Sequence, residues 1–264
     1  MKQSLHQKIV VITGASTGIG EQIAYAAAAK GALPILVART EARLEAAKEK
    51  VKQRTGIVPI VKVCDVSDVS AVQYMIHDIE ENTGPIFSYI HNAGFGAFDY
   101  AEDVDLKQAE EMFQLNVISG AAAAKFLIPN FKARREGSII FTGSISSRLP
   151  TPKTSIYSAT KHAVAGYADA LRMELKPYGI HVGVLMPGPV DTSFFDTADE
   201  SGRYKENIEK IMLAPEAVGR AAVELVTRRK RVRMMPWWMG AAARAYQLAP
   251  ALIEKIGGNA FKQK

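Results

Sequence analysis

The sequence predicts a single α/β domain built on a doubly wound parallel sheet with helices on both faces. Its 264 residues are 48% hydrophobic and 23% charged, which supplies one sizeable core and is too polar for a bundle of membrane helices. Short β-branched runs alternate with helix-compatible windows from the start of the chain, as in parallel strands joined by crossover helices. No repeat, low-complexity tract or linker divides the chain, so we expect one domain over residues 1–264.

The predicted strands are short apolar runs bounded by turn residues. The first, residues 8–13 (KIVVIT), is β-branched without alternation between apolar and polar positions, which is typical of a strand buried on both faces. Five more runs share this character: residues 33–38, 58–63, 86–90, 138–142 and 180–186.

The windows between these runs predict helices. They cover residues 18–30, 41–54, 68–82, 105–135, 155–177 and 215–228. We expect Pro129 to kink or end the long helix 105–135, because proline lacks the amide that an interior turn needs. Gly179 is placed to cap the helix before it. Residues 188–212 show no sustained period, which predicts an irregular segment near a functional site.

A glycine-rich loop, TGASTGIG at residues 13–20, joins the first strand to the first helix. This strand–loop–helix context is the one in which backbone amides hold a dinucleotide pyrophosphate. Gly14 allows the tight turn, Gly18 lets the backbone approach the phosphates, and Gly20 permits close packing of helix on strand. The candidate cofactor-binding residues of this Rossmann-like loop are Gly14, Ser16, Thr17, Gly18, Ile19 and Gly20.

Arg39 follows the second strand, about 20 residues beyond the loop. An acidic residue there would bind a ribose 2′-hydroxyl, whereas a guanidinium suits a 2′-phosphate. No carboxylate precedes Arg39 in that strand, so the sequence favours NADP(H) over NAD(H). The alternative is a surface arginine paired with Glu41 or another neighbour.

Tyr157 and Lys161 stand four residues apart at the start of a predicted helix and therefore share one face. An ammonium beside a phenol favours the phenolate and lowers its pKa toward working pH. A Tyr–Lys pair alone is more often a partly buried aromatic next to a solvated charge. Other motifs must therefore decide between this structural interpretation and a catalytic one.

The chain resembles the short-chain dehydrogenase/reductase family over roughly residues 8–192. The matching elements, in order, are TGxxxGxG at 13–20, NAG at 92–94, Asn116, Ser144, YxxxK at 157–161 and PG at 187–188. The resemblance implies a sheet of about seven strands and an oxidoreductase acting on carbonyls or secondary alcohols. It also implies catalytic roles: Ser144 orients the carbonyl, Tyr157 exchanges the proton, Lys161 holds the nicotinamide ribose and tunes Tyr157, and Asn116 holds a relay water. Ser146 and Ser147 compete with Ser144, and the family spacing favours Ser144.

The resemblance implies further cofactor contacts at the carboxyl ends of strands. These residues are Asp65, Val66, Asn92, Ala93, Gly94, Pro187, Gly188, Val190 and Thr192, together with Tyr157 and Lys161. His91 departs from the family, which usually has Asn before NAG, and we expect it to be a structural hydrogen bonder. No metal site is predicted.

The substrate is expected to be a hydrophobic ketone or alcohol of steroid, lipid or xenobiotic type, because the predicted pocket is lined by apolar side chains. These are Phe95, Phe98, Leu149, Phe194 and Phe195. The sequence leaves two alternatives open: a 3-oxoacyl-carrier-protein reductase, whose acidic carrier a basic surface would attract, and a non-catalytic nucleotide-binding scaffold.

The net charge of +6 is concentrated in part in the run RRKRVR at 228–233. Nucleic-acid binding by this run is not expected, because no partner motif accompanies it. Residues 188–214 are predicted as a substrate segment and 234–264 as an extension. The extension is too interrupted to span a bilayer, and forms either a lid or subunit contact or a peripheral membrane contact. A homodimer or homotetramer in the cytoplasm is expected, since the Ala- and Gly-rich helices could pack on a symmetry mate, no signal peptide is evident and Cys64 is the single cysteine.

Overall fold

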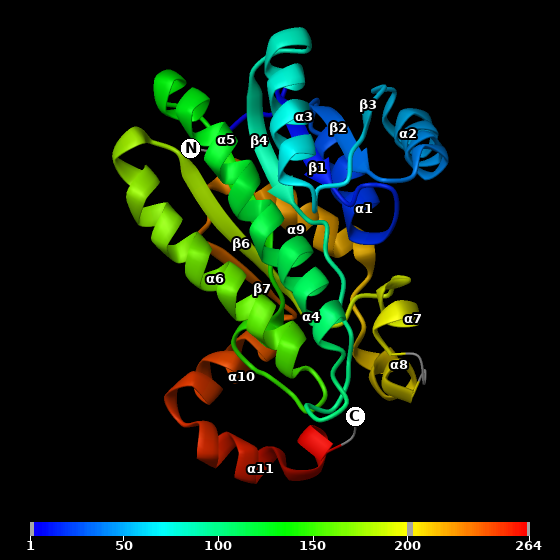
Figure 1. The fold of residues 1–264 in the computed structure, drawn as a ribbon, viewed down its shortest axis with the longest axis vertical. Coiled ribbons are helices and arrows are strands. Elements are labelled where there is room, and N and C mark those ends of the chain that lie inside the picture. The colour runs from blue at the N-terminus through cyan, green and yellow to red at the C-terminus, as the bar shows by residue number, and fades with distance from the viewer. Residues whose placement is uncertain (1–2, 200–202, 263–264) are drawn as a thin grey trace.

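The computed structural model describes residues 3–199 and 203–262 and confirms the predicted fold class (Figure 1). A seven-stranded parallel sheet has the order β3-β2-β1-β4-β5-β6-β7. The strands are β1 (Ile9–Thr13), β2 (Leu33–Ala38), β3 (Ile60–Val63), β4 (Ile86–His91), β5 (Ser138–Thr142), β6 (His181–Pro187) and β7 (Val232–Met235).

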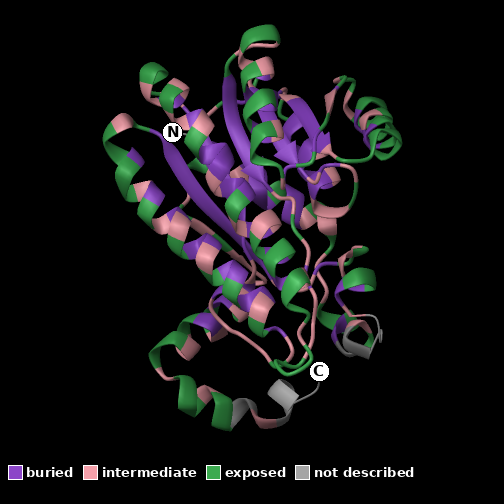
Figure 2. Ribbon diagram, viewed as in Figure 1, coloured by how far each residue is buried: buried purple, intermediate pink, exposed green. Residues whose placement is uncertain are grey.

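Helices cover both faces of this sheet. One face packs against α1 (Gly18–Ala28), α2 (Glu41–Thr55) and α9 (Pro215–Arg228), and the other against α3 (Val69–Asn82), α5 (Ser119–Arg134) and α6 (Ser155–Leu175). Each face has its own apolar cluster, and the central strands β1, β4, β5 and β6 are buried along their whole length (Figure 2). The absence of alternation in these strands follows from burial on both faces.

The strand order reverses between β1 and its neighbours β2 and β4. Val11 of β1 pairs with Ile35 on one side and with Tyr89 on the other. The connections that follow β1 and β4 therefore diverge to opposite sides, which opens a crevice at the carboxyl edge of the sheet where open α/β folds bind ligands.

The predicted helix 105–135 is not one regular helix. It consists of α4 (Leu106–Phe113), a π-helical segment (Gln114–Ile118) and α5, and the irregular turn centres on Asn116. Pro129 does not end the helix, because α5 continues through it to Arg134. The Leu106–Arg134 stretch is long and apolar enough to cross a membrane by composition alone, but its apolar side chains pack on the sheet, with Leu127 and Phe131 fully buried.

The C-terminal third contains more regular structure than the sequence predicted. Residues 188–212 include α7 (Phe194–Ala198), α8 (Arg203–Ile208) and a 3₁₀ turn (Glu209–Ile211), while 200–202 of the predicted substrate segment lie outside the described residues. Part of the basic run forms the edge strand β7, followed by α10 (Trp237–Leu248) and α11 (Pro250–Lys262). Residues 263–264 of the predicted extension also lie outside the described residues.

Candidate active site

A cavity of about 1440 Å³ opens along the carboxyl edge of the sheet. Single small-molecule sites usually measure about 300–1,000 Å³, so this one has room for two ligands side by side. Every predicted cofactor residue lines it except Gly20, and Ser144 lines it as well. Asn116 lies behind the wall and is buried.

The glycines of the loop after β1 have the conformations that their predicted roles require. Gly14 and Gly18 adopt φ values of +63° and +56°, which side chains other than glycine rarely tolerate. A Cβ on Gly20 would lie 2.0 Å from the carbonyl oxygen of Gly14, so only glycine allows α1 to start this close to the strand. The first amides of α1 have no intrahelical partner because they begin a helix, and they face the cavity at Gly18 and Ile19.

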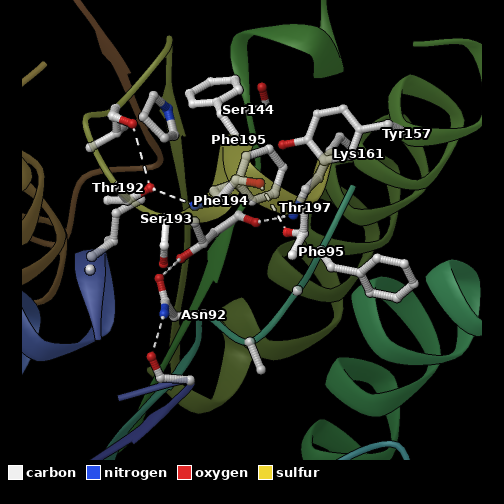
Figure 3. A pocket seen from close by; sticks show the side chains of 18 of the residues that line it. Asn92, Phe95, Ser144, Tyr157, Lys161, Thr192, Ser193, Phe194, Phe195 and Thr197 are labelled. Carbon is white, nitrogen blue, oxygen red and sulfur yellow. Dashed lines mark hydrogen bonds between the residues drawn. The ribbon is translucent and has the colours of Figure 1, made fainter. Parts of the chain in front are cut away.

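Hydrogen bonds tie the loops after β1, β4 and β5 together. The Thr13 hydroxyl accepts from the amides of Asn92 (3.0 Å) and Ala93 (2.9 Å). The Asn92 side-chain amide donates to the Thr13 carbonyl (3.1 Å), and its oxygen accepts from the Thr142 hydroxyl (3.3 Å) (Figure 3). Asn92 therefore braces three loops. Thr13 and Thr142, the last residues of β1 and β5, were not among the predicted site residues.

Tyr157, on the first turn of α6, and Ser144, which follows β5, line the same cavity (Figure 3). The Ser144 hydroxyl oxygen accepts from the Ser146 amide (3.1 Å). Burial raises the pKa of Tyr157 to about 12, and the Ser144 hydrogen bond opposes that rise. Of the two competing serines, Ser147 is fully buried and Ser146 reaches the cavity.

Lys161 lies one turn beyond Tyr157, with its ammonium 5.6 Å from the centre of the phenol ring. The ammonium donates to the Thr142 carbonyl (3.0 Å), and burial lowers the pKa of Lys161 to about 8. The predicted lowering of the Tyr157 pKa by Lys161 is not found in the chain by itself, because desolvation of the phenolate dominates there.

Asn116 fixes the loop after β4 from the π-helical segment. Its side chain donates to the Phe95 carbonyl (2.9 Å) and to the Thr160 hydroxyl (3.1 Å), and accepts from the Phe95 amide (3.0 Å). The Asn116 carbonyl lies 3.2 Å from Nε2 of His91. The structure thus makes His91 a hydrogen bonder to the backbone, as expected, while a relay water at Asn116 stays a prediction.

A cationic end of the cavity lies next to β2. Arg39 and Arg43 both line it, and within the described chain neither forms an ion pair with Glu41 or any other carboxylate. Burial tends to raise the pKa of Asp65, but hydrogen bonds from Ser67 and the charge of Arg39 outweigh it and lower that pKa. Arg43 was not predicted, although a second arginine four residues after Arg39, in the first turn of α2, was a usable signal.

Aromatic rings line the opposite end. The Phe98 ring lies 5.7 Å from Tyr157 and 6.3 Å from Phe194, and Phe194 lies 5.7 Å from Tyr157 and 5.4 Å from Phe195. Phe95 lines the cavity as well, but its ring points away from this cluster (Figure 3). Ile208 and Ile211, from the predicted substrate segment 188–214, also form this wall. Trp238, Met239 and Ala242 of α10 complete it, and the sequence did not single them out as pocket residues.

Comparison with known proteins finds a family match and similar reductases and dehydrogenases. A sequence model described as short chain dehydrogenase matches residues 8–202. The 3-ketodihydrosphingosine reductase of Bos taurus is 34% identical over 190 residues, which span 70% of this chain and 57% of the bovine protein. The 11-beta-hydroxysteroid dehydrogenase of Pinus massoniana is 30% identical over 247 residues, or 89% of this chain and 69% of the pine protein.

Solved structures share the fold over nearly the whole chain. The L-sorbose reductase of Gluconobacter frateurii, in complex with NADPH and L-sorbose, superimposes with a TM-score of 0.79 at 25% sequence identity. The alignment covers 89% of this chain and 97% of the reductase.

Proposed function

Because the chain belongs to the short chain dehydrogenase family, we propose that it is an NADP(H)-dependent oxidoreductase for hydrophobic ketones or secondary alcohols. The observation that carries this proposal is the meeting of Ser144, Tyr157 and Lys161 in one cavity with a glycine-rich loop at the start of α1. The catalytic roles of these residues, of Asn116 and of the cofactor contacts belong to the proposal.

The cavity fits a dinucleotide. Side chains on Gly14 or Gly18 would crowd Ala93 or Thr192, so the backbone there forms a shallow cradle next to the free amides of α1. Arg39 and Arg43 would hold a 2′-phosphate, and Asp65 and Val66 lie beside them along the same wall. A bound nicotinamide supplies or accepts the hydride.

The chain's own residues move the proton and hold the substrate. In the reducing direction the Ser144 hydroxyl donates to the substrate carbonyl oxygen and stabilises the charge that develops there. Tyr157, whose raised pKa keeps it protonated near neutral pH, donates its proton to the same oxygen. Lys161 is positioned behind Tyr157 to hold the ribose and to favour the phenolate once proton transfer begins.

The substrate end favours an apolar molecule. The rings of Phe98 and Phe194 contact Tyr157, Phe195 packs against both of them, and the remaining wall is formed by Leu149, Ile208, Ile211 and α10. The named activities of the bovine and pine relatives, on a keto-sphingoid and a hydroxysteroid, are consistent with this class. The chain's match spans just over half of the bovine protein, so the particular compound is part of the proposal.

Cytoplasmic placement and assembly into a homo-oligomer complete the proposal. The single cysteine supports a reducing compartment. Exposed apolar side chains on the helices support contact between copies, namely those of Phe113, Ile118 and Met173. Light scattering of the purified protein tests the oligomer.

A ketone panel with NADPH, read by loss of the reduced cofactor's absorbance, tests the function. The panel should contain steroid, long-chain and small ketones and a 3-oxoacyl thioester. Tyr157→Phe should lower kcat by about 10³-fold while NADPH binding, measured by calorimetry, stays near the parent value. Tyr167→Phe, on the same helix but outside the cavity, is the matched control. Parental turnover by Tyr157→Phe would refute the mechanism, and NADPH binding without turnover of any ketone would support a binding-only protein.

A further inference from the structure

The C-terminal arm, defined as α10 and α11, carries an exposed apolar surface. Both tryptophans of the 264-residue chain lie on it, with Trp237 82% exposed and Trp238 45% exposed. Leu248 is 88% exposed and Leu252 56% exposed. Figure 2 shows the arm extending from the body with mostly exposed residues. Large exposed apolar groups this close together mark an interaction surface.

The exposed residues of α10 form one stripe. Trp237, Ala241, Arg244 and Leu248 recur at helical spacing and are all exposed. The opposite side of α10 is anchored to the body, where Gly240 and Ala243 are buried and Gly240 packs against Met234 of β7. The Tyr246 hydroxyl donates to Glu254 (2.8 Å) and links α10 to α11. The stripe therefore faces outward from a helix whose inner side is fixed.

The charges around this stripe select the partner. Arg233, Arg244 and Lys255 are exposed, and none forms an ion pair within the part of the chain that the structure describes. The one described carboxylate of the arm, Glu254, is already bonded to Tyr246. A second copy docking through the same stripe would bring Arg244 against an apolar surface without a carboxylate. At a lipid surface the long arginine side chain can instead reach the headgroup phosphates.

We propose that the C-terminal arm docks on an anionic lipid surface. Trp237 and Leu248 enter the layer between headgroups and acyl chains, where tryptophan is favoured, and Arg244 pairs with lipid phosphate. The basic run 228–233 offers less free positive charge to the lipid than its sequence suggests. Arg229 donates to the Gly179 carbonyl, and Arg231 pairs with Asp169. The arm lies on the surface and does not cross the bilayer.

The arm also forms a wall of the catalytic cavity. Trp238, Met239 and Ala242 of α10 line it, on the side of the helix away from Leu248. Docking would thus place the apolar end of the cavity beside the lipid, where a hydrophobic ketone concentrates. This consequence rests on the proposed function, whereas docking itself does not.

Tryptophan fluorescence of the full chain tests the docking directly. In Trp238→Phe, Trp237 is the single tryptophan, and its emission should shift to the blue on phosphatidylcholine vesicles that contain phosphatidylglycerol. Brominated acyl chains should quench it. Neither cofactor nor turnover is needed, so failure of the oxidoreductase proposal would leave this result intact.

Vesicle flotation of paired variants identifies the surface. The double variant Trp237→Ser, Leu248→Ser should weaken binding at least about tenfold, because two apolar side chains no longer enter the lipid. The matched control Tyr74→Ser, Leu106→Ser removes two apolar groups from α3 and α4 that are also more than 70% exposed, and it should bind like the parent. Arg244→Gln should weaken binding to anionic vesicles by about fivefold.

Each of four outcomes would overturn the proposal. The first three are an emission maximum unchanged by vesicles, equal losses in the two double variants, and parental flotation of the arm variant. The fourth is that the parent does not bind vesicles while the arm variant loses self-association in light scattering, which would make the arm a contact between copies.

Discussion

Different forces hold the side chains in place at the two ends of the cavity: the cofactor end, at the glycine-rich loop, and the substrate end, at the aromatic cluster. At the cofactor end, directional hydrogen bonds between Thr13, Asn92 and Thr142 fix the loops, and glycines at positive φ form the cradle. At the substrate end, Phe98, Phe194 and Phe195 meet through ring contacts of 5.4–6.4 Å. Hydrogen bonds and backbone conformation require particular residues at particular positions, whereas apolar packing accepts many combinations. The cofactor end therefore tolerates little change, and the substrate end can vary.

The largest expected effect of a substitution is at the cofactor end. Gly20→Ala places a Cβ 2.0 Å from the Gly14 carbonyl, in backbone that cannot move without opening the loop. The free energy of unfolding should fall by more than about 3 kcal/mol, measured by urea denaturation, with loss of NADPH binding. Gly166→Ala is the control, since its Cβ meets nothing within 4 Å, and it should stabilise α6 by up to about 1 kcal/mol. Parental stability of Gly20→Ala would contradict this view of the loop.

Acid should destabilise the protein through His91, which is buried at the end of β4 and contacts the Asn116 carbonyl. Burial lowers its pKa to about 4, from the ordinary 6.5, so the folded state keeps the imidazole neutral. Because the unfolded chain binds the proton first, this stability is complete above pH 6.5 and is lost as the pH falls toward 4. The full loss is about 3 kcal/mol.

Urea denaturation at a series of pH values measures this effect. His91→Asn should flatten the dependence between pH 6.5 and 4, whereas the exposed His77→Asn should leave it unchanged. Equal slopes in the parent and in His91→Asn would exclude His91 as the source. His181, also buried with its pKa lowered to about 4, should supply the residual slope.

Arg39 tests whether charge at the cofactor end selects the dinucleotide. Arg39→Asp should weaken NADPH binding by about tenfold to a hundredfold and NADH binding much less, because only NADPH carries the 2′-phosphate. Calorimetry with both dinucleotides measures the ratio. Arg220→Asp, exposed on α9 outside the cavity, controls for the change in net charge. Equal losses for the two dinucleotides would remove Arg39 from this role.

The smallest expected effect is at the substrate end. Phe194→Ala removes a ring next to Tyr157 and should raise KM for a hydrophobic ketone about tenfold, while the dissociation constant of NADPH stays unchanged. Phe113→Ala, on α4 outside the cavity, is the control. An equal loss of NADPH affinity in Phe194→Ala would show that the two ends are not independent.

Burial of whole segments explains which elements could be predicted. Strands β1, β2, β5 and β6 lie within a residue or two of their predicted bounds, because strands buried on both faces must be continuously apolar. Strand β3 starts two residues late, at Ile60, since Val58 is half exposed and gains nothing from pairing. The edge strand β7 was missed because one of its sides faces solvent and tolerates Arg233.

The long helix shows where local rules fail. Proline at position 129 costs one hydrogen bond, yet packing of Leu127 and Phe131 on the sheet keeps α5 helical through it. The break occurs instead at Asn116, where tertiary hydrogen bonds to Phe95 and Thr160 favour an extra residue in the turn. No sequence signal at 114–118 reports those distant partners.

The amino-acid sequence by itself determined the fold class, the cofactor loop and the order of the candidate catalytic residues. Glycine conformations, strand burial and the Tyr–Lys spacing are local properties that residue types alone impose. Only the tertiary structure decided that α10 lines the apolar end of the cavity, that His91 contacts the Asn116 backbone, and that burial raises the pKa of Tyr157. Each of these depends on contacts between residues far apart in the chain, and on the desolvation that accompanies those contacts.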